Sequence, residues 1–167
     1  MIRIVSTYGV ISGAVVATPM LWTWLTLEPG DDPFANVFIG YLTMIVALTM
    51  VFLGVKRHRD RALGGVIRFL PAFGLGLAIS AVASVFYVAA WEICLAFGSF
   101  DFVAYYSKVL TDAGKAAEAE SFRSMYANPL IRVAMTFIEI FPVGILISAL
   151  TAAVLRNSRV LPARRTP

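Results

Sequence analysis

The fold of this chain is decided by one long apolar stretch, VIRFLPAFGLGLAISAVASVFYVAAWEICLAF, which covers residues 66–97. Its only charged residues are Arg68 and Glu92. As a helix the stretch would be roughly 48 Å long, which exceeds the ~30 Å hydrocarbon thickness of a bilayer. We therefore expect a membrane span over about 73–96. The preceding residues, 64–71, are expected to form an interfacial lead-in on the cytoplasmic surface.

Three further apolar stretches are long enough to cross a bilayer, over about 4–27, 36–55 and 130–155. The chain is 59% hydrophobic and 14% charged, whereas soluble domains are about 45–50% apolar and about 25% charged. A cleaved signal peptide is the competing interpretation of the first stretch, but the apolar run continues past a cleavage site at 15–17. The sequence predicts an all-α transmembrane four-helix bundle that forms one membrane domain, 1–167.

Residues 98–128 form a mixed segment between the third and fourth spans. Aromatic and aliphatic residues recur there at helical spacing, and Gly114 is the expected break. Asn128-Pro129 is the expected stop before the fourth span. The pattern predicts an amphipathic segment of one broken helix or two short helices, which either lies flat on the membrane or caps the bundle.

Charge asymmetry predicts the orientation. The N-terminus, the loop around 56–68 and the tail 156–167 together hold ten basic residues and one acidic residue, whereas the opposite loops hold three basic and seven acidic residues. Because cytoplasmic loops carry the excess of Lys and Arg, both termini and the basic tail should be cytoplasmic and 98–128 periplasmic. Trp22, Trp24 and Trp91 fall at the outer ends of their spans, where such rings favour the headgroup region.

Small residues recur at every fourth position in three spans, a spacing that lets helix backbones approach closely in lipid. These ridges are Gly9-Gly13-Ala17, Gly76-Ser80-Ser84 and Gly144-Ser148-Ala152. They predict close helix packing within the chain, or packing of at least one ridge against a second subunit in a homo-oligomer or against a membrane protein partner.

Ionisable residues within spans are the candidate functional groups, because a charge near the bilayer centre costs about 2.5–3.5 kcal/mol on insertion scales. Glu139 is the strongest candidate, with Pro142 as a helix irregularity beside it. Arg132 and Glu92 could join Glu139 in one polar pocket. Glu139 could handle protons or ions, contact a substrate, or form a structural hydrogen bond or salt bridge with Arg132. Alternatively, Glu92 and Arg132 reach outward to the headgroups.

The basic cluster at the end of the second span is a topology signal or a site for anionic lipid headgroups, with Lys56, Arg57, Arg59 and Arg61 as the candidate contacts. Membrane topology explains the basic residues without nucleic acid. His58 is the single histidine and Cys94 the single cysteine, so we expect no metal site. The sequence contains no phosphate loop, zinc motif or serine elbow. We expect no cofactor and no catalytic residue.

Several separated motifs resemble one bacterial family. They are the runs IGYLTMI (39–45), GVKRHRD (54–60), YVAAWE (87–92), NPL (128–130), TFIE (136–139) and PVG (142–144). Over nearly the whole chain this pattern resembles the family catalogued as "domain of unknown function 4199". The resemblance implies a small four-span bacterial inner-membrane protein with its longer loop in the periplasm. It supplies no catalytic residue, because the family has no established activity.

The function expected from these observations is that of a membrane component associated with transport or envelope homeostasis, with Glu139 as a buried titratable group. The alternative is a non-catalytic scaffold or regulatory subunit that binds a membrane partner. In that case the 98–128 segment and the small-residue ridges would make the contacts.

Overall fold

The structure, a computed structural model, describes residues 1–28 and 37–162, and over these ranges it contains helices and no strands. The helices in chain order are α1 (Ile2–Thr26), α2 (Val37–Ala62), α3 (Phe69–Phe97), α4 (Phe102–Asp112), α5 (Ala116–Ala127) and α6 (Pro129–Leu155). The predicted all-α fold is confirmed. The connection between the first two spans and the last five residues of the basic tail lie outside the described residues.

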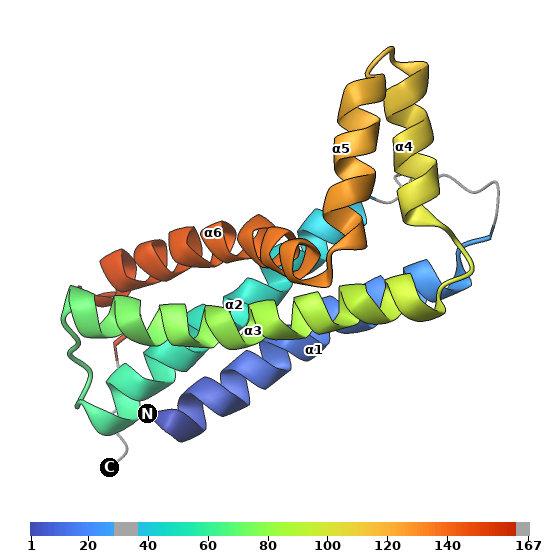
Figure 1. Ribbon diagram of the computed structural model, residues 1–167. Coiled ribbons are helices and arrows are strands. Elements are labelled where there is room, and N and C mark those ends of the chain that lie inside the picture. Colours follow the sequence, from blue (N-terminus) through green and yellow to red (C-terminus); the bar gives the residue numbers. More distant parts are fainter. Residues whose placement is uncertain (29–36, 163–167) are drawn as a thin grey trace.

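Four helices, α1, α2, α3 and α6, are long and apolar enough to cross a membrane. The predicted multi-pass membrane protein is therefore supported. These four helices form the bundle, and α4 and α5 form a hairpin that projects from one end of it (Figure 1). The N-terminus, the α2–α3 connection and the end of α6 lie together at the opposite end (Figure 1).

Helix α1 packs against α3 through the first small-residue ridge. A Cβ added at Gly9 would lie 2.6 Å from Val82 Cβ, and one added at Gly13 would lie 2.5 Å from Phe86 Cβ. Both distances are well below ordinary van der Waals contact, so these two positions require glycine for the helices to approach this closely. Next to this seam, Ser12 Oγ donates a 2.7 Å hydrogen bond to the Ala47 carbonyl of α2. That hydroxyl is fully buried.

Helices α3 and α6 meet through the other two ridges. Gly144 lies against Ser80, and Gly76 lies against Ser148, with distances of 2.7 and 2.9 Å from an added Cβ to the facing serine Cβ. The two serine hydroxyls lie 3.3 Å apart, and Ser148 Oγ also donates to the Gly144 carbonyl at 2.7 Å. All three predicted ridges therefore have packing partners within the chain.

We call the end of the bundle opposite the hairpin its inner end. The core there consists of interlocking aliphatic side chains from α2, α3 and α6 and the α2–α3 connection: Leu48, Val51, Val55, Ile67, Ala72, Leu75, Ile79, Ala152 and Leu155. Because these side chains come from every part of the inner end, they fix the relative positions of the three helices there.

Two helices extend beyond the predicted spans at the inner end. Helix α2 continues to Ala62, seven residues beyond the predicted end of its span at 55, and α3 begins at Phe69, four residues before the predicted start of its span at 73. The extension of α2 carries the basic cluster, which is helical rather than a loop. Gly64 and Gly65 end α2 with φ values of 64° and 92°, and the Gly65 amide donates to the Arg59 carbonyl at 2.9 Å. This is the left-handed termination that glycine allows.

The projecting hairpin follows the predicted breaks. Asp101 caps α4 by accepting a 2.9 Å hydrogen bond from the Ala104 amide, as N-cap carboxylates do. Gly114, with φ of 77°, turns the chain between α4 and α5. Asn128 accepts from the Leu130 amide at 3.0 Å, and Pro129 occupies the first turn of α6. Of the two predicted alternatives, two short helices are confirmed, and they run across the direction of α3 and α6 at one end of the bundle (Figure 1).

Candidate functional site

An ion pair joins α3 and α6 near the base of the hairpin. Arg132 Nε donates to Glu92 Oε1 at 2.7 Å, and a second guanidinium nitrogen of Arg132 contacts Glu92 Oε2. The third nitrogen donates to the Tyr126 carbonyl at 2.9 Å. The two charged side chains are 20% and 29% exposed. Because all three nitrogens of the guanidinium have acceptors, Arg132 ties α3, α5 and α6 together, and Glu92 compensates its charge.

At the same end of the bundle, aromatic rings join the hairpin to the long helices. The ring centroid of Trp24 in α1 lies 4.9 Å from that of Trp91 in α3, and the Trp91 centroid lies 5.0 Å from that of Phe102 in α4. By the same measure, the Phe102 ring lies 5.7 Å from the Tyr126 ring, and the Tyr126 ring lies 4.4 Å from the Phe122 ring. Such pairs add about 0.5–1.5 kcal/mol each beyond the area that they bury. The base of the hairpin is thus fixed to α1 and α3.

The Tyr126 hydroxyl lies within this cluster. Burial raises the pKa of Tyr126 above its ordinary value, and a hydrogen bond from Trp91 opposes the increase. The negative charge of Glu139 raises the pKa of Tyr126 further, which places that carboxylate within electrostatic range. Tyr126 therefore remains neutral at physiological pH.

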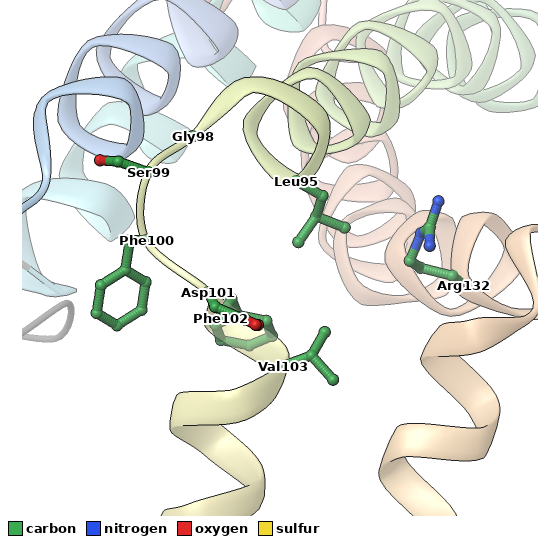
Figure 2. Close-up of a pocket in the computed structure, with 8 residues that line it drawn as sticks. All are labelled: Leu95, Gly98, Ser99, Phe100, Asp101, Phe102, Val103 and Arg132. Carbon is green, nitrogen blue, oxygen red and sulfur yellow. The ribbon is translucent and has the colours of Figure 1, made fainter. Parts of the chain in front are cut away.

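A cavity of about 320 Å³ opens beside the first turn of α4. Its lining residues come from the end of α3, the 98–101 connection, α4 and α6, with Arg132 on one side and Phe100 and Phe102 on the other (Figure 2). Arg132 is already fully hydrogen-bonded, and the Asp101 carboxylate caps α4. The charges that line this cavity are therefore engaged, and it offers no free charge to a ligand.

Glu139 differs from Glu92 because its side chain is exposed. It lies ten residues after Pro129, which places it roughly 15 Å along α6 from the end that carries the hairpin. Among residues 1–28 and 37–162, no hydrogen bond or ion pair involves its carboxylate. The Glu92–Arg132 pair lies about two turns closer to that end. A charge at this depth, in an apolar helix, has no compensating partner within the described chain.

Tyr87 of α3 and Tyr126 of α5 lie within electrostatic range of the Glu139 carboxylate. Tyr87 of α3 precedes Glu92 by five residues and so lies at about the level of Glu139 in the antiparallel α3–α6 pair. Glu139, Tyr126 and Tyr41 are all within electrostatic range of the Tyr87 hydroxyl.

The predicted polar pocket forms only in part. Glu92 and Arg132 come together, but the predicted alternative in which Glu139 forms a salt bridge with Arg132 is wrong, because Glu92 and Tyr126 occupy that guanidinium. Pro142 lies inside α6, which remains one continuous helix through it. Sequence reasoning missed the tyrosines, because helical spacing alone cannot say which of many aromatic residues face a carboxylate on another helix.

The basic cluster also divides into two kinds of residue. Arg57 and Arg61 are exposed and Lys56 is partly buried, so these three remain candidate headgroup contacts. Arg59 is fully buried, and its assignment as a headgroup contact is wrong. Its guanidinium donates to the Val160 and Leu161 carbonyls at 3.0 and 2.5 Å, and its Nε donates to Asp60 at 2.7 Å. Arg59 holds the residues after α6 against the end of α2.

A family model described as "Protein of unknown function (DUF4199)" matches residues 7–157. The chain belongs to this family. The match covers the hairpin, α2, α3, α6 and all but the first five residues of α1, and it confirms the resemblance expected from the sequence motifs. The DUF4199 assignment gives no activity, so the role of Glu139 has to be argued from its chemistry. Neither the curated proteins nor the solved structures include a match to the chain.

Proposed function

We propose that this protein is a transport-associated component of the bacterial inner membrane, in which the Glu139 carboxylate exchanges a proton or a cation. The observation that carries the proposal is the exposure of Glu139 within an apolar membrane-spanning helix, with no hydrogen bond or ion pair among the described residues. An ionised carboxylate in hydrocarbon requires a cation, and a neutral one requires a proton. Exchange between these two states is the chemistry that this position supports.

The Glu92–Arg132 ion pair differs from Glu139, and this difference supports the proposed role of Glu139. Glu92 and Arg132 neutralise each other in a geometry that stabilises the junction of α3, α5 and α6. We assign them a structural role. The cytoplasmic placement of both termini, with Lys56, Arg57 and Arg61 near anionic headgroups, belongs to the same proposal and rests on the excess of Lys and Arg at that end.

Glu139→Gln tests the proposal, because glutamine keeps the shape of the side chain and removes its charge and proton. The purified full chain is reconstituted into vesicles that contain a pH-sensitive dye, and proton movement is followed after a pH jump. We expect movement with the wild-type chain and with Glu120→Gln, a carboxylate substitution on exposed α5. We expect none with Glu139→Gln. Equal proton movement in all three proteins would contradict the proposal.

A scaffold or regulatory subunit is the second candidate function. The projecting α4–α5 hairpin favours it, because a hairpin held rigidly by aromatic contacts suits a partner outside the membrane. In that case Glu139→Gln would leave proton movement unchanged and would alter the set of membrane proteins that co-purify with the chain. If deletion of the hairpin removed those proteins and Glu139→Gln did not, the result would favour a scaffold role in which Glu139 takes no part.

A further inference from the structure

One exposed face of α2 passes from apolar side chains to two arginines at the inner end of the bundle. Leu53, Arg57 and Arg61 are all exposed, and their spacing of four residues places them in one line along the helix. Val46, seven residues before Leu53, lies on the same face and is 49% exposed. By helical rise, Arg57 and Arg61 lie roughly 6 and 12 Å beyond Leu53. A phospholipid whose acyl chain lies against this face would therefore place its headgroup at the two arginines.

The ion pairs at this end of α2 leave Arg57 and Arg61 without a carboxylate. Asp60 is the only acidic residue of the basic cluster. Its two carboxylate oxygens accept from Lys56 Nζ at 2.5 Å and from Arg59 Nε at 2.7 Å. The ion pairs in the part of the chain that the structure describes include neither Arg57 nor Arg61. These two guanidinium groups therefore present two uncompensated positive charges on one face.

Tyr8 of α1 lies beside Arg57 and adds a hydroxyl to this face. Gly54 makes room for the Tyr8 side chain, because a Cβ added at Gly54 would lie 3.0 Å from Tyr8 Cγ and 3.1 Å from Tyr8 Cβ. Arg57 Nη1 donates to the Tyr8 hydroxyl at 3.5 Å, which is a long and weak hydrogen bond. A guanidinium has several further N–H donors, and the Tyr8 hydroxyl keeps its own proton. Both groups can therefore donate to a common ligand.

These donors suit the phosphate diester of a phospholipid. Guanidinium groups bind phosphate oxygens through paired N–H donors, and such charge-assisted hydrogen bonds are roughly twice as strong as neutral ones. In an anionic phospholipid the negative phosphate is joined to apolar chains. The face of α2 has the same order, because Arg57 and Arg61 lie at the inner end and Leu53 lies deeper in the span.

Resting on the part of the proposed function that sets the inner end among anionic headgroups, we propose that Arg57, Arg61 and Tyr8 form a binding site for the phosphate diester of one anionic phospholipid. The two arginines bind the phosphate oxygens, and the Tyr8 hydroxyl donates to one of them. The acyl chain lies along the exposed apolar side of α2. The basic residues that are already paired with Asp60 take no part. The site differs from diffuse attraction because it holds one lipid in a fixed place.

Native mass spectrometry of the full-length chain released from detergent micelles tests the proposal, because it counts the lipids that each chain retains. We expect dioleoyl-phosphatidylglycerol to bind at least about tenfold more tightly than dioleoyl-phosphatidylcholine, which has the same chains but a positive charge beside its phosphate. We expect glycerol 3-phosphate, which carries a phosphate and no chains, not to displace the phosphatidylglycerol. This arm separates a lipid headgroup from free phosphate as the ligand.

Four variants make the test specific. Arg57→Gln and Arg61→Gln should each weaken phosphatidylglycerol binding about fivefold, which is the contribution expected of one basic residue near an anionic surface. Tyr8→Phe should weaken it about threefold, because phenylalanine keeps the packing against Gly54 and removes only the hydroxyl. Arg156→Gln is the matched control, because Arg156 is exposed at the end of α6 and its substitution removes the same charge. Binding should be preserved in this control.

Equal binding of the two phospholipids, displacement of the lipid by glycerol 3-phosphate, or equal weakening by Arg156→Gln and Arg57→Gln would overturn the proposal. In the last case the inner end attracts headgroups diffusely, so the proposed function stands and only the specific site is wrong. The assay of proton movement with Glu139→Gln tests the proposed exchange independently. If that assay shows no dependence on Glu139 while lipid selectivity is retained, the exchange is wrong and this site stands.

Discussion

The α3–α6 seam makes a quantitative prediction, because two glycines on α3 face different surroundings. A Cβ added at Gly76 would lie 2.9 Å from the Ser148 Cβ and 3.2 Å from its Cα. A Cβ added at Gly74, two residues earlier, would have no such atom within 4 Å. Favourable carbon–carbon contacts lie at about 3.5–4.0 Å. Gly76→Ala therefore pushes the two helix backbones apart by roughly 1 Å, whereas Gly74→Ala displaces nothing.

The expected magnitudes follow from these distances. Replacing glycine by alanine inside a helix stabilises by up to about 1 kcal/mol, and this gain applies to both variants. Overpacking costs about 1–3 kcal/mol and applies only to Gly76→Ala. The free energies of unfolding of the two variants should therefore differ by about 1–3 kcal/mol. Reversible unfolding in mixed detergent micelles, followed by circular dichroism, measures this difference.

A compensating substitution sharpens the test. Ser148→Gly removes the two nearest atoms that the new methyl group would strike, the Ser148 Cβ and Oγ, so it should restore part of the stability lost in Gly76→Ala. Recovery should be incomplete, because Ser148 Oγ also donates to the Gly144 carbonyl at 2.7 Å. If Gly76→Ala proves as stable as Gly74→Ala, the helices do not approach as closely as the structure places them, and the reasoning from small-residue ridges fails.

Three further predictions concern the rest of the bundle. Removing either partner of the Glu92–Arg132 pair should cost about 1.5–3 kcal/mol of unfolding free energy, and a double-mutant cycle in micelles should give a favourable interaction energy; additive effects would exclude a direct pair. Arg59→Met should speed tryptic cleavage after Arg159, because the residues after α6 lose their hydrogen bonds, whereas Arg61→Met should not; equal rates would refute the anchoring role of Arg59. Compartment-sensitive reporters at the two termini should give the cytoplasmic signal and one in the α4–α5 turn the periplasmic signal; termini in opposite compartments would overturn the orientation.

The four spans were predictable because a helix needs about 20 apolar residues to cross the hydrocarbon layer. Length and composition locate the four spans, and Gly114 and Asn128 mark the hairpin and the start of α6 through local backbone chemistry that needs no distant partner. The spacing of glycine and serine likewise predicts close packing, since four residues return a helix to nearly the same face. These features depend on neighbours in the sequence.

Features that depend on distant partners were not predictable in this way. Arg59 looked like a surface charge because its acceptors lie about a hundred residues later in the chain, at Val160 and Leu161. The apolar run around Glu139 suggested a buried side chain. In the structure, Gly144 and Ser148 mark the side of α6 that faces α3, and the Glu139 side chain is exposed. The family match could not resolve either point, because it carries no site residues.

The burial of Arg59 has a consequence for how the protein is made. Its guanidinium precedes the Leu155, Val160 and Leu161 carbonyls by 96, 101 and 102 residues. During translation α2 must therefore wait, with this charge in water or among headgroups, until α6 has been inserted and the residues after it have left the ribosome. Completion of this end of the bundle is thus a late event in biogenesis. A chain interrupted before residue 160 would lack the two carbonyls, of Val160 and Leu161, that accept hydrogen bonds from this buried guanidinium.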